Sequence, residues 1–370
     1  MKVVILSEIN WSFLRQRHHF ITEDFAKHHD VVFVERIVSR ELSFKNLKSF
    51  LLNKLRSSKK IKVQIQSRPN IKFVKSFYIP SNSILATILN RLWYKLFLEK
   101  YVKDAFVYSF TPMIDLVQGY HCLCFDIIHN WWDMKWNQKV ISKRLNLYLK
   151  KADAIITDSP RINDRLAELN LQSSPRLLIP GLSKRWFDFF QIESREYKKK
   201  ISSNRLVFFG NLRSNSDLSL VRRLSEIYKV DLYGVVQDNC KNFIQNCNLM
   251  GEFCQEKLMH KLLDYDAVIL PYENEEFSKY ISPAKYFECL SLKIPIITNS
   301  ELDHLPLWNE VKVQFNKQIN RAELKKNLEI TNRLIENSHS EIDKVLSENI
   351  WELKIQKHNK ALIDEFTKSQ

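Results

Sequence analysis

The stretch from 280 to 300, YISPAKYFECLSLKIPIITNS, carries the most structural information in this 370-residue chain. Ser282 and Pro283 form a polar turn that opens a helix, because proline at the first helical position has a preset φ and lacks an N–H that would stay unpaired. The helix ends near Lys293. The apolar, β-branched run that follows at 294–298 is typical of a buried parallel strand.

The same helix carries charges that suit a nucleotide. Its first turn offers unpaired N–H groups and a positive dipole end, which favour a phosphate, and Lys285 adds a point charge. Glu288 lies one turn further on and can accept two hydrogen bonds from a ribose diol. The local pattern alone leaves an ordinary surface helix, with a solvated lysine and glutamate, as an equal alternative.

Strand and helix patterns alternate along both halves of the chain, which predicts two parallel sheets. The first half opens with strands at 2–7 and 30–35 around a helix. It lacks the G-x-G-x-x-G pattern, which argues against a dinucleotide-binding site. A second Rossmann-like unit begins at 205–210, after a polar and charged linker at 189–204. The length suits two domains.

Residues 280–300 resemble the donor-sugar motif of GT-B glycosyltransferases of the family 4 type. In that family a P-x-K-x-x-E turn is followed by small residues and a proline-containing strand. ADAIITDS at 152–159 and LLIPGLS at 177–183 are similar to the sequences that end the first domain in the same family. Many members carry a second glutamate eight positions before the P-x-K-x-x-E glutamate, where this chain has Tyr280.

The resemblance implies an α/β chain with the GT-B fold, in which two Rossmann-like domains with parallel sheets face an interdomain cleft. We expect an N-terminal acceptor-binding domain at 1–188 and the linker at 189–204. We expect a C-terminal nucleotide-sugar-binding domain at 205–345. The last helix, at 346–370, is expected to cross back to the first domain.

On the donor side, the resemblance implies that Glu288 holds the nucleotide ribose. Gly210 lets the backbone approach the pyrophosphate. Arg213 could act as a catalytic residue that stabilises the leaving diphosphate, with a solvated loop arginine as the equal alternative. The expected donor-binding residues are Gly210, Asn211, Gly251, Phe253, Tyr272, Ser282, Pro283, Lys285 and Glu288.

Two polar clusters follow predicted strand ends in the first half and are expected to meet the acceptor. The first contains Trp11, Arg15, Arg17 and His18. The second surrounds Asp126 and His129, either of which could act as a catalytic general base toward the acceptor hydroxyl. Retaining enzymes of the family are thought to use no protein base, so both residues could instead position the acceptor.

We expect no metal site and no cofactor beyond the nucleotide-sugar co-substrate. Adjacent histidines, as at 18–19 and 28–29, point apart on a helix. No Asp-x-Asp motif follows an early strand, as it does in metal-dependent GT-A transferases, so Lys, Arg and a helix dipole would neutralise the phosphates. The six cysteines lack C-x-x-C spacing, which favours buried thiols in a reducing cytosol over disulfides or zinc.

Positive charge is concentrated in the first half of the chain. Residues 1–190 hold 31 Lys+Arg and 16 Asp+Glu, whereas residues 191–370 hold 26 of each. Within 44–103 there are 14 basic residues and one acid, Glu99. This asymmetry indicates an anionic partner, either nucleic acid or a membrane surface.

Two segments of this region are basic and amphipathic, at 41–60 and at 84–102, and the second contains Trp93, Tyr94 and Phe97. A basic helix with aromatic residues on its apolar side can lie in a membrane interface. For the second segment, a core-facing helix with a polar outer face is an equal alternative.

The preferred function is transfer of a hexose from a UDP- or GDP-sugar to a lipid-linked or growing cell-surface glycan. We expect a cytoplasmic protein that binds the anionic inner face of the plasma membrane through residues 44–103. No apolar run approaches the roughly 18 residues that a membrane-spanning helix needs.

Two alternatives stay open. A nucleic-acid-binding protein could use the basic region 44–103 with Trp93, Tyr94 and Tyr101 as stacking groups. This accounts for the charge but not for the donor-like second half, so we expect no nucleic-acid partner. A non-catalytic GT-B scaffold is the other alternative, because Tyr280 replaces the first glutamate and the first loop is poor in glycine.

Overall fold

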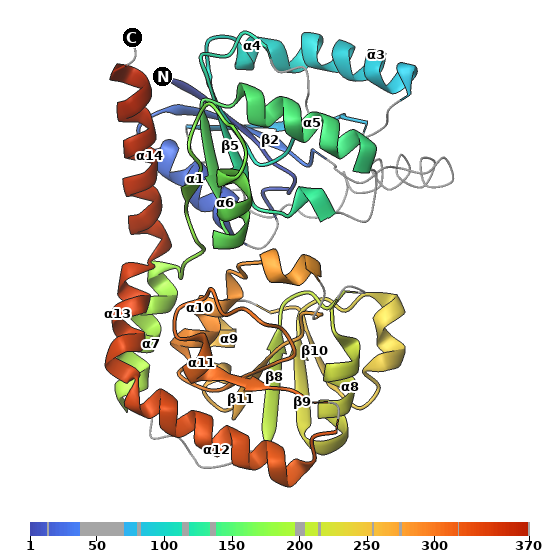
Figure 1. The fold of residues 1–370 in the computed structure, drawn as a ribbon, viewed down its shortest axis with the longest axis vertical. Helices are drawn as coiled ribbons and strands as arrows, with labels where there is room; N and C mark the ends of the chain where they lie inside the picture. The colour runs from blue at the N-terminus through green and yellow to red at the C-terminus, as the bar shows by residue number, and fades with distance from the viewer. Residues whose placement is uncertain are drawn as a thin grey trace. The chain divides into compact units, whose positions relative to one another are not determined.

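A computed structural model gives the three-dimensional structure of the chain. It describes residues 1–12, 15–37, 70–79, 83–112, 118–133, 138–196, 204–213, 216–253, 255–273, 276–316 and 318–368. The chain forms two compact units, Met1–Ile179 with Ile355–Gln370 and Pro180–Lys354 (Figure 1). Each unit is Rossmann-like and is built on one parallel sheet, as the sequence predicted.

The first unit contains a seven-stranded sheet in the order β3-β2-β1-β4-β5-β6-β7. Its central strands are buried apolar runs, which is typical of a parallel sheet that is covered on both faces. The order of the strands reverses between β1 and β4. The strands are β1 (Lys2–Leu6), β2 (Asp30–Glu35), β3 (Ile71–Lys75), β4 (Phe106–Ser109), β5 (Cys122–Ile127), β6 (Ala154–Thr157) and β7 (Arg176–Leu177).

Helices flank this sheet (Figure 1). They are α1 (Arg17–Phe25), α3 (Ile84–Trp93), α4 (Glu99–Val102), α5 (Gln138–Lys151), α6 (Pro160–Ala167) and the later part of α14 (Trp351–Lys368). The ring of Phe366 packs 5.9 Å from that of Phe106 in β4. The side-chain amide of Asn359 donates a hydrogen bond to Asp24 at 3.0 Å. These contacts hold the end of α14 beside α1.

Helix α3 begins at the cap residue Ser83, whose hydroxyl accepts a hydrogen bond from the Ala86 N–H at 3.1 Å. A π-helical turn, Tyr94–Leu98, joins it to α4. Trp93 and Tyr94 are buried in the core, so these two aromatic residues do not lie on the outer side, where the membrane interpretation placed them. The other amphipathic segment, 41–60, lies outside the described residues.

The second unit contains a six-stranded parallel sheet in the order β10-β9-β8-β11-β12-β13. One face packs on α8 (Leu218–Ile227) and α12 (Arg321–Asn337) through Leu220, Leu224, Leu324 and Leu328. The strands are β8 (Arg205–Phe209), β9 (Lys229–Tyr233), β10 (Asn248–Gly251), β11 (Ala267–Leu270), β12 (Ile296–Thr298) and β13 (Lys312–Gln314).

The helices of this unit are α7 (Lys184–Glu196), α8 (Leu218–Ile227), α9 (Gln255–Leu262), α10 (Lys285–Ser291), α11 (Trp308–Val311), α12 (Arg321–Asn337) and α13 (His339–Glu348). Helix α7 includes part of the stretch that we expected to be a linker. Its Trp186 indole donates a hydrogen bond to Ser291 of α10 at 2.6 Å, and its ring stacks on Phe209. Helix α7 is therefore part of the packed second unit.

Candidate functional site

The strand order of the second unit places its candidate site where β8 and β11 lie side by side. Ligands of open α/β sheets bind outside the carboxyl ends of the strands at such a reversal of strand order. The Asp217 N–H donates to the Pro271 carbonyl at 2.8 Å, which ties the loop after β8 to the loop after β11. Asn299, after β12, donates to the Asp217 carboxylate at 3.0 Å. Three strand ends are thereby fixed together.

Gly210 directly follows β8 and faces the side chain of Lys285. Its φ is +129°, in the region that favours glycine. A Cβ at this position would lie 2.1 Å from Nζ of Lys285. The absence of a side chain at 210 therefore leaves the space that the lysine ammonium occupies.

Gly234, after β9, supports the same loop from the next strand. A Cβ there would lie 2.0 Å from the Gly210 carbonyl oxygen, and its φ is +124°. The Gly210 N–H donates to the Tyr233 carbonyl at 2.8 Å, and the Gly234 N–H donates to the Gly251 carbonyl at 2.7 Å. Glycines at the ends of three neighbouring strands thus let the loops pack backbone to backbone.

Lys285 lies at the start of α10 with its ammonium over aromatic rings. Nζ is 4.9 Å from the ring centroid of Phe208 and 5.4 Å from that of Phe209, which is cation–π geometry. Burial lowers the pKa of Lys285, and the nearby charge of Arg213 lowers it further, while Glu288 raises it. Among the described residues, no hydrogen bond or ion pair engages this ammonium, so an incoming anion can take it as a partner.

Glu288 is placed one turn after Lys285 on α10. Burial raises the pKa of its carboxyl to about 7, against the lowering effect of Lys285. Within the described part of the chain, its carboxylate makes no hydrogen bond. A partly buried carboxylate without a partner is suited to accept hydrogen bonds from ligand hydroxyl groups.

Tyr272 and Ser282 complete this edge of the sheet. Burial raises the pKa of the Tyr272 phenol, and the nearby Cys289 and Glu288 raise it further, so the phenol lies close to α10. The hydroxyl of Ser282 is 3.2 Å from Nε2 of His304. Helix α10 starts at Lys285 and ends at Ser291, rather than running from Pro283 to near Lys293 as predicted. Pro283 precedes the cap residue and accepts a hydrogen bond from the Tyr286 N–H.

The remaining expected donor residues lie at the margin of this arrangement. The edge of the Phe253 ring faces Tyr233, with 6.4 Å between centroids. Gly251 has φ +75° with open space around its Cα. Asn211 and Arg213 follow Gly210, and Arg213 is exposed apart from its backbone N–H, which donates to Ser216. These residues are near the site, and the structure leaves their roles as predictions.

In the first unit, Arg17 and Asp126 form a buried ion pair. The Arg17 guanidinium donates to both carboxylate oxygens of Asp126, at 2.7 and 2.8 Å, and also to the Leu178 carbonyl. The Tyr108 hydroxyl donates to the same carboxylate at 2.7 Å. Asp126 is wholly buried, so both residues hold α1 against β5. This geometry gives Asp126 a structural role and leaves it no open side for an acceptor hydroxyl.

His129, two residues after β5, has a different setting. Its Nε2 lies 3.1 Å from a carboxylate oxygen of Glu8, which follows β1. The imidazole is 41% exposed, so it is open to a ligand in a way that Asp126 is not. Its neighbour Asn130 donates to Asp133 at 2.6 Å.

The three other expected acceptor residues lie on and before α1. His18 is buried with its ring 3.8 Å from that of Phe110. Burial lowers its pKa far below the usual value, as do the charges of His19, His129 and Arg17. Trp11 packs against the Phe33 and Phe73 rings, and Arg15 pairs with Glu23. Trp11 and Arg15 are therefore fixed by the unit itself.

Sequence reasoning missed three residues at these strand ends. Gly234 makes its contact with a loop 24 positions earlier, and Glu8 reaches across to His129. Asp158 directly follows β6, and the cap residue of α6 is Ser159, which makes no side-chain capping bond. A polar residue directly after a buried strand was the available signal for both Glu8 and Asp158.

No three His, Cys, Asp or Glu side chains of the described ranges are grouped so that they could hold a metal ion. No helix within those ranges is both long and apolar enough to cross a bilayer.

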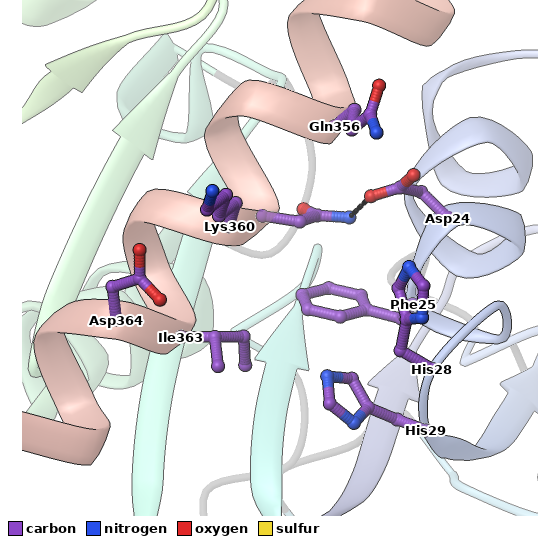
Figure 2. Close-up of a pocket in the computed structure, with 9 residues that line it drawn as sticks. Asp24, Phe25, His28, His29, Gln356, Lys360, Ile363 and Asp364 are labelled. Atoms are coloured by element: carbon purple, nitrogen blue, oxygen red, sulfur yellow. Dashed lines mark hydrogen bonds between the residues drawn. The ribbon is translucent and has the colours of Figure 1, made fainter.

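A cavity of about 230 Å³ lies between α14 and the end of α1 (Figure 2). It is lined by Asp24, Phe25, His28, His29, Gln356, Asn359, Lys360, Ile363 and Asp364. Helix α1 begins with Arg17 beside Asp126 of β5 and ends at Phe25, so within the first unit this cavity lies at the other end of α1 from Asp126.

No protein-family model and no curated protein matches the chain. Solved structures do match the chain. Sucrose-phosphate synthase from Thermosynechococcus elongatus matches with 12% identity, a TM-score of 0.65, and coverage of 99% of this chain and 100% of its own. HepE from Anabaena, in complex with UDP and glucose, matches with 11% identity, a TM-score of 0.62, and coverage of 98% and 99%.

A third match is the structure described as trehalose-6-phosphate from E. coli bound with UDP-2-fluoro glucose. It has 10% identity, a TM-score of 0.62, and coverage of 99% of both chains. At such low identity the likeness concerns the fold, and the assignment to family 4 stays a prediction. The two parallel-sheet units and these matches show that the chain has the GT-B glycosyltransferase fold.

Proposed function

We propose that the protein is a glycosyltransferase that transfers a hexose from a nucleotide sugar, either UDP- or GDP-linked, to a glycan acceptor. The observation that carries the proposal is the arrangement of Gly210, Lys285 and Glu288. At the strand ends where α/β sheets bind ligands, the absence of a side chain at Gly210 leaves space for the Lys285 ammonium. Among the described residues, neither this ammonium nor the Glu288 carboxylate makes a hydrogen bond or an ion pair.

Each of these residues has a chemical task in the proposal. Gly210 makes room for the ammonium of Lys285, and this ammonium neutralises the diphosphate. Glu288 accepts hydrogen bonds from the ribose diol. The anomeric carbon exchanges its bond to the phosphate oxygen for a bond to the oxygen of the acceptor hydroxyl. The electron pair of the broken bond stays on the diphosphate, and the hydroxyl proton passes to the released phosphate oxygen. Lys285 and Arg213 then stabilise the added charge. Because protein cations do this, we expect transfer without a metal ion.

Two of the matching structures favour uridine as the base of the donor. HepE is described in complex with UDP and glucose, and the E. coli protein with UDP-2-fluoro glucose. Tyr272 and Phe253 are candidates to contact the base.

The acceptor belongs to the first unit in this proposal, at the strand ends that carry Glu8 and His129. His129 is exposed and hydrogen-bonded to a carboxylate, so it can orient an acceptor hydroxyl. The acceptor class that we propose is a lipid-linked or growing cell-surface glycan, handled on the cytoplasmic side of the plasma membrane.

The outer face of α3 and of the π-helical turn supports attachment to a membrane. Seven large apolar side chains are between 42% and 81% exposed there: Ile84, Leu85, Ile88, Leu89, Leu92, Leu96 and Phe97. The exposed basic residues among and after them are Arg91, Lys95, Lys100 and Lys103. An apolar stripe can insert at the acyl boundary of a membrane, and its basic neighbours can contact the headgroups of an anionic leaflet.

Thermal unfolding in the presence of nucleotides tests the donor assignment. The protein is heated with UDP, GDP, CMP or their sugars in buffer that contains EDTA. A ligand at a hundred times its Kd adds about 2.7 kcal/mol to the free energy of unfolding, so the matching nucleotide is expected to raise the Tm. Glu288→Gln is expected to lose this rise, and the exposed Glu329→Gln is the matched control. No rise with any nucleotide would contradict the proposal.

A further inference from the structure

Four neighbouring strands of the first unit, β1, β4, β5 and β6, bring polar residues to one edge of the sheet. Ile127 of β5 pairs with Thr157 of β6, so His129 and Asp158 follow paired positions on adjacent strands. Glu8 follows β1 and reaches His129 across the end of β4. These strand ends therefore form one continuous polar edge.

Several polar atoms at this edge are buried and make no hydrogen bond in the structure. They are Oε1 of Glu8, both ring nitrogens of His18, Oδ1 of Asn130 and Oγ of Ser159. His18, Asn130 and Ser159 are each at least 97% buried. Native proteins rarely leave buried polar atoms without partners, so a cluster of them calls for a ligand.

Asp158 directly precedes Ser159 at this edge. Among the described residues, its carboxylate accepts a hydrogen bond from its own backbone N–H and from no other residue. Arg17, whose charge acts on Asp158, already donates to Asp126 and to the Leu178 carbonyl. Burial raises the pKa of Asp158 to about 7. Arg17 and His129 oppose the rise, and the negative charge of Asp126 adds to it.

The unpaired groups also define the kind of ligand. Carboxylate and amide oxygens accept hydrogen bonds, whereas a hydroxyl and a neutral imidazole both donate and accept them. Sugar hydroxyl groups match this mixture. A phosphate fits poorly, because Glu8 and Asp158 are both acidic and the Arg17 guanidinium is already paired within the unit.

We propose that Asp158 binds a hydroxyl group of the acceptor, and that the acceptor presents an uncharged sugar ring, not a phosphate, to this edge. The inference rests on the proposed glycosyl transfer and names the acceptor group that the first unit recognises. The ionised carboxylate of Asp158 accepts a stronger hydrogen bond from a hydroxyl than the protonated carboxyl does, so acceptor use rises with pH around 7.

The first experiment needs no substrate. A carboxyl whose pKa is raised on folding favours the folded state when protonated, and this stability is lost as the pH rises from about 4 to about 7. Asp158→Asn is therefore expected to raise the Tm at pH 8 and to leave it unchanged at pH 4. Asp164→Asn, an exposed carboxylate on α6, is the control without effect. A lower Tm for Asp158→Asn at pH 8 would show a structural carboxylate and overturn the proposal.

The second experiment measures UDP release from UDP-glucose with D-glucose, N-acetyl-D-glucosamine or D-glucose 6-phosphate as acceptor probes. The neutral sugars are expected to stimulate release more than the sugar phosphate. Asp158→Asn is expected to reduce that stimulation at least tenfold and to flatten its pH profile, with the KM for UDP-glucose unchanged. Equal stimulation in Asp158→Asn and Asp164→Asn, or preference for the phosphate, would refute the inference.

The two proposals fail in different ways. If the unaltered protein binds and releases no nucleotide, the glycosyl transfer itself is wrong, and the pH dependence of the Tm alone decides whether Asp158 is an unpaired binding group. If nucleotide release is normal and Asp158→Asn behaves as Asp164→Asn does, only the acceptor assignment falls.

Discussion

The ammonium of Lys285 fills the place where a side chain at Gly210 would begin, since a Cβ on Gly210 would lie 2.1 Å from Nζ. Two residues 75 positions apart in the sequence thus share one small space at the end of β8. Gly210→Ala is expected to push the lysine aside and to strain a backbone with φ +129°. We expect a loss of stability of about 1–3 kcal/mol together with weaker nucleotide binding, measured by urea unfolding and by nucleotide-dependent Tm.

Gly119→Ala is the control for this change. Gly119 also has positive φ, at +70°, but nothing lies within 4 Å of a Cβ built there. It should lower stability through backbone strain alone and leave nucleotide binding intact. Loss of nucleotide binding in both variants would refute a specific part for Gly210.

Lys285→Met is expected to separate stability from binding. Burial lowers the pKa of Lys285, so keeping its ammonium charged reduces the stability of the folded protein without ligand. Methionine keeps most of the apolar stem and removes the charge. The Tm without nucleotide should therefore stay equal or rise. A fall in that Tm would show that the ammonium has a structural role instead.

From the raised pKa of Glu288 we predict that nucleotide binding depends on pH. Its pKa of about 7 lies above the ordinary value, so folding favours the protonated carboxyl, and its contribution to stability is lost as the pH rises from about 4.5 to about 7. The ionised carboxylate accepts stronger hydrogen bonds from the two ribose hydroxyls than the protonated carboxyl does. The rise in Tm caused by nucleotide should be larger at pH 8 than at pH 6, and Glu288→Gln should remove the difference. The same pH dependence in Glu288→Gln would contradict the assigned role.

We predict that substitutions in the ion pair of Arg17 and Asp126 change the stability of the protein and not its nucleotide binding. Asp126→Asn leaves the Arg17 charge buried and without its counter-ion, which costs about 3–5 kcal/mol in urea unfolding. The double variant Arg17→Met with Asp126→Leu removes both charges and should recover much of that loss. Nucleotide binding by the folded fraction should not change. An Asp126→Asn protein of normal stability would contradict the structural assignment.

The apolar face of α3 predicts binding to vesicles. Burying one leucine is worth about 1.5–3 kcal/mol, so Leu85→Ser with Leu92→Ser should weaken sedimentation with phosphatidylglycerol vesicles by more than tenfold. Leu353→Ser removes another exposed leucine, from α14, and serves as control. If binding is lost in high salt but is unchanged by the leucine substitutions, the protein attaches to vesicles through its basic residues alone.

The sequence predicted most of the central architecture because buried parallel strands read as apolar runs. β2 has the predicted bounds. β3 and β13 were not predicted. β3 includes two lysines among its five residues and is partly exposed at the sheet edge, and β13 has three residues, so neither shows the apolar run of a central strand.

The candidate site was predictable where the residues are close in the sequence. Lys285 and Glu288 share one helix turn and a recognisable motif. Gly234 and Asp158 were not predictable in their present roles, because these depend on contacts between distant segments. Gly234 needs the Gly210 carbonyl beside it, and the pKa of Asp158 depends on burial and on Arg17 and Asp126.

Titration calorimetry of UDP and UDP-glucose, in buffer with EDTA, measures binding at the proposed site itself. We expect saturable binding at one site per chain, at least tenfold weaker in Lys285→Met and unchanged in Lys326→Met, which alters an exposed lysine on α12. The absence of binding by the unaltered protein, or equal affinity in the two lysine variants, would contradict a nucleotide-sugar site at Gly210, Lys285 and Glu288.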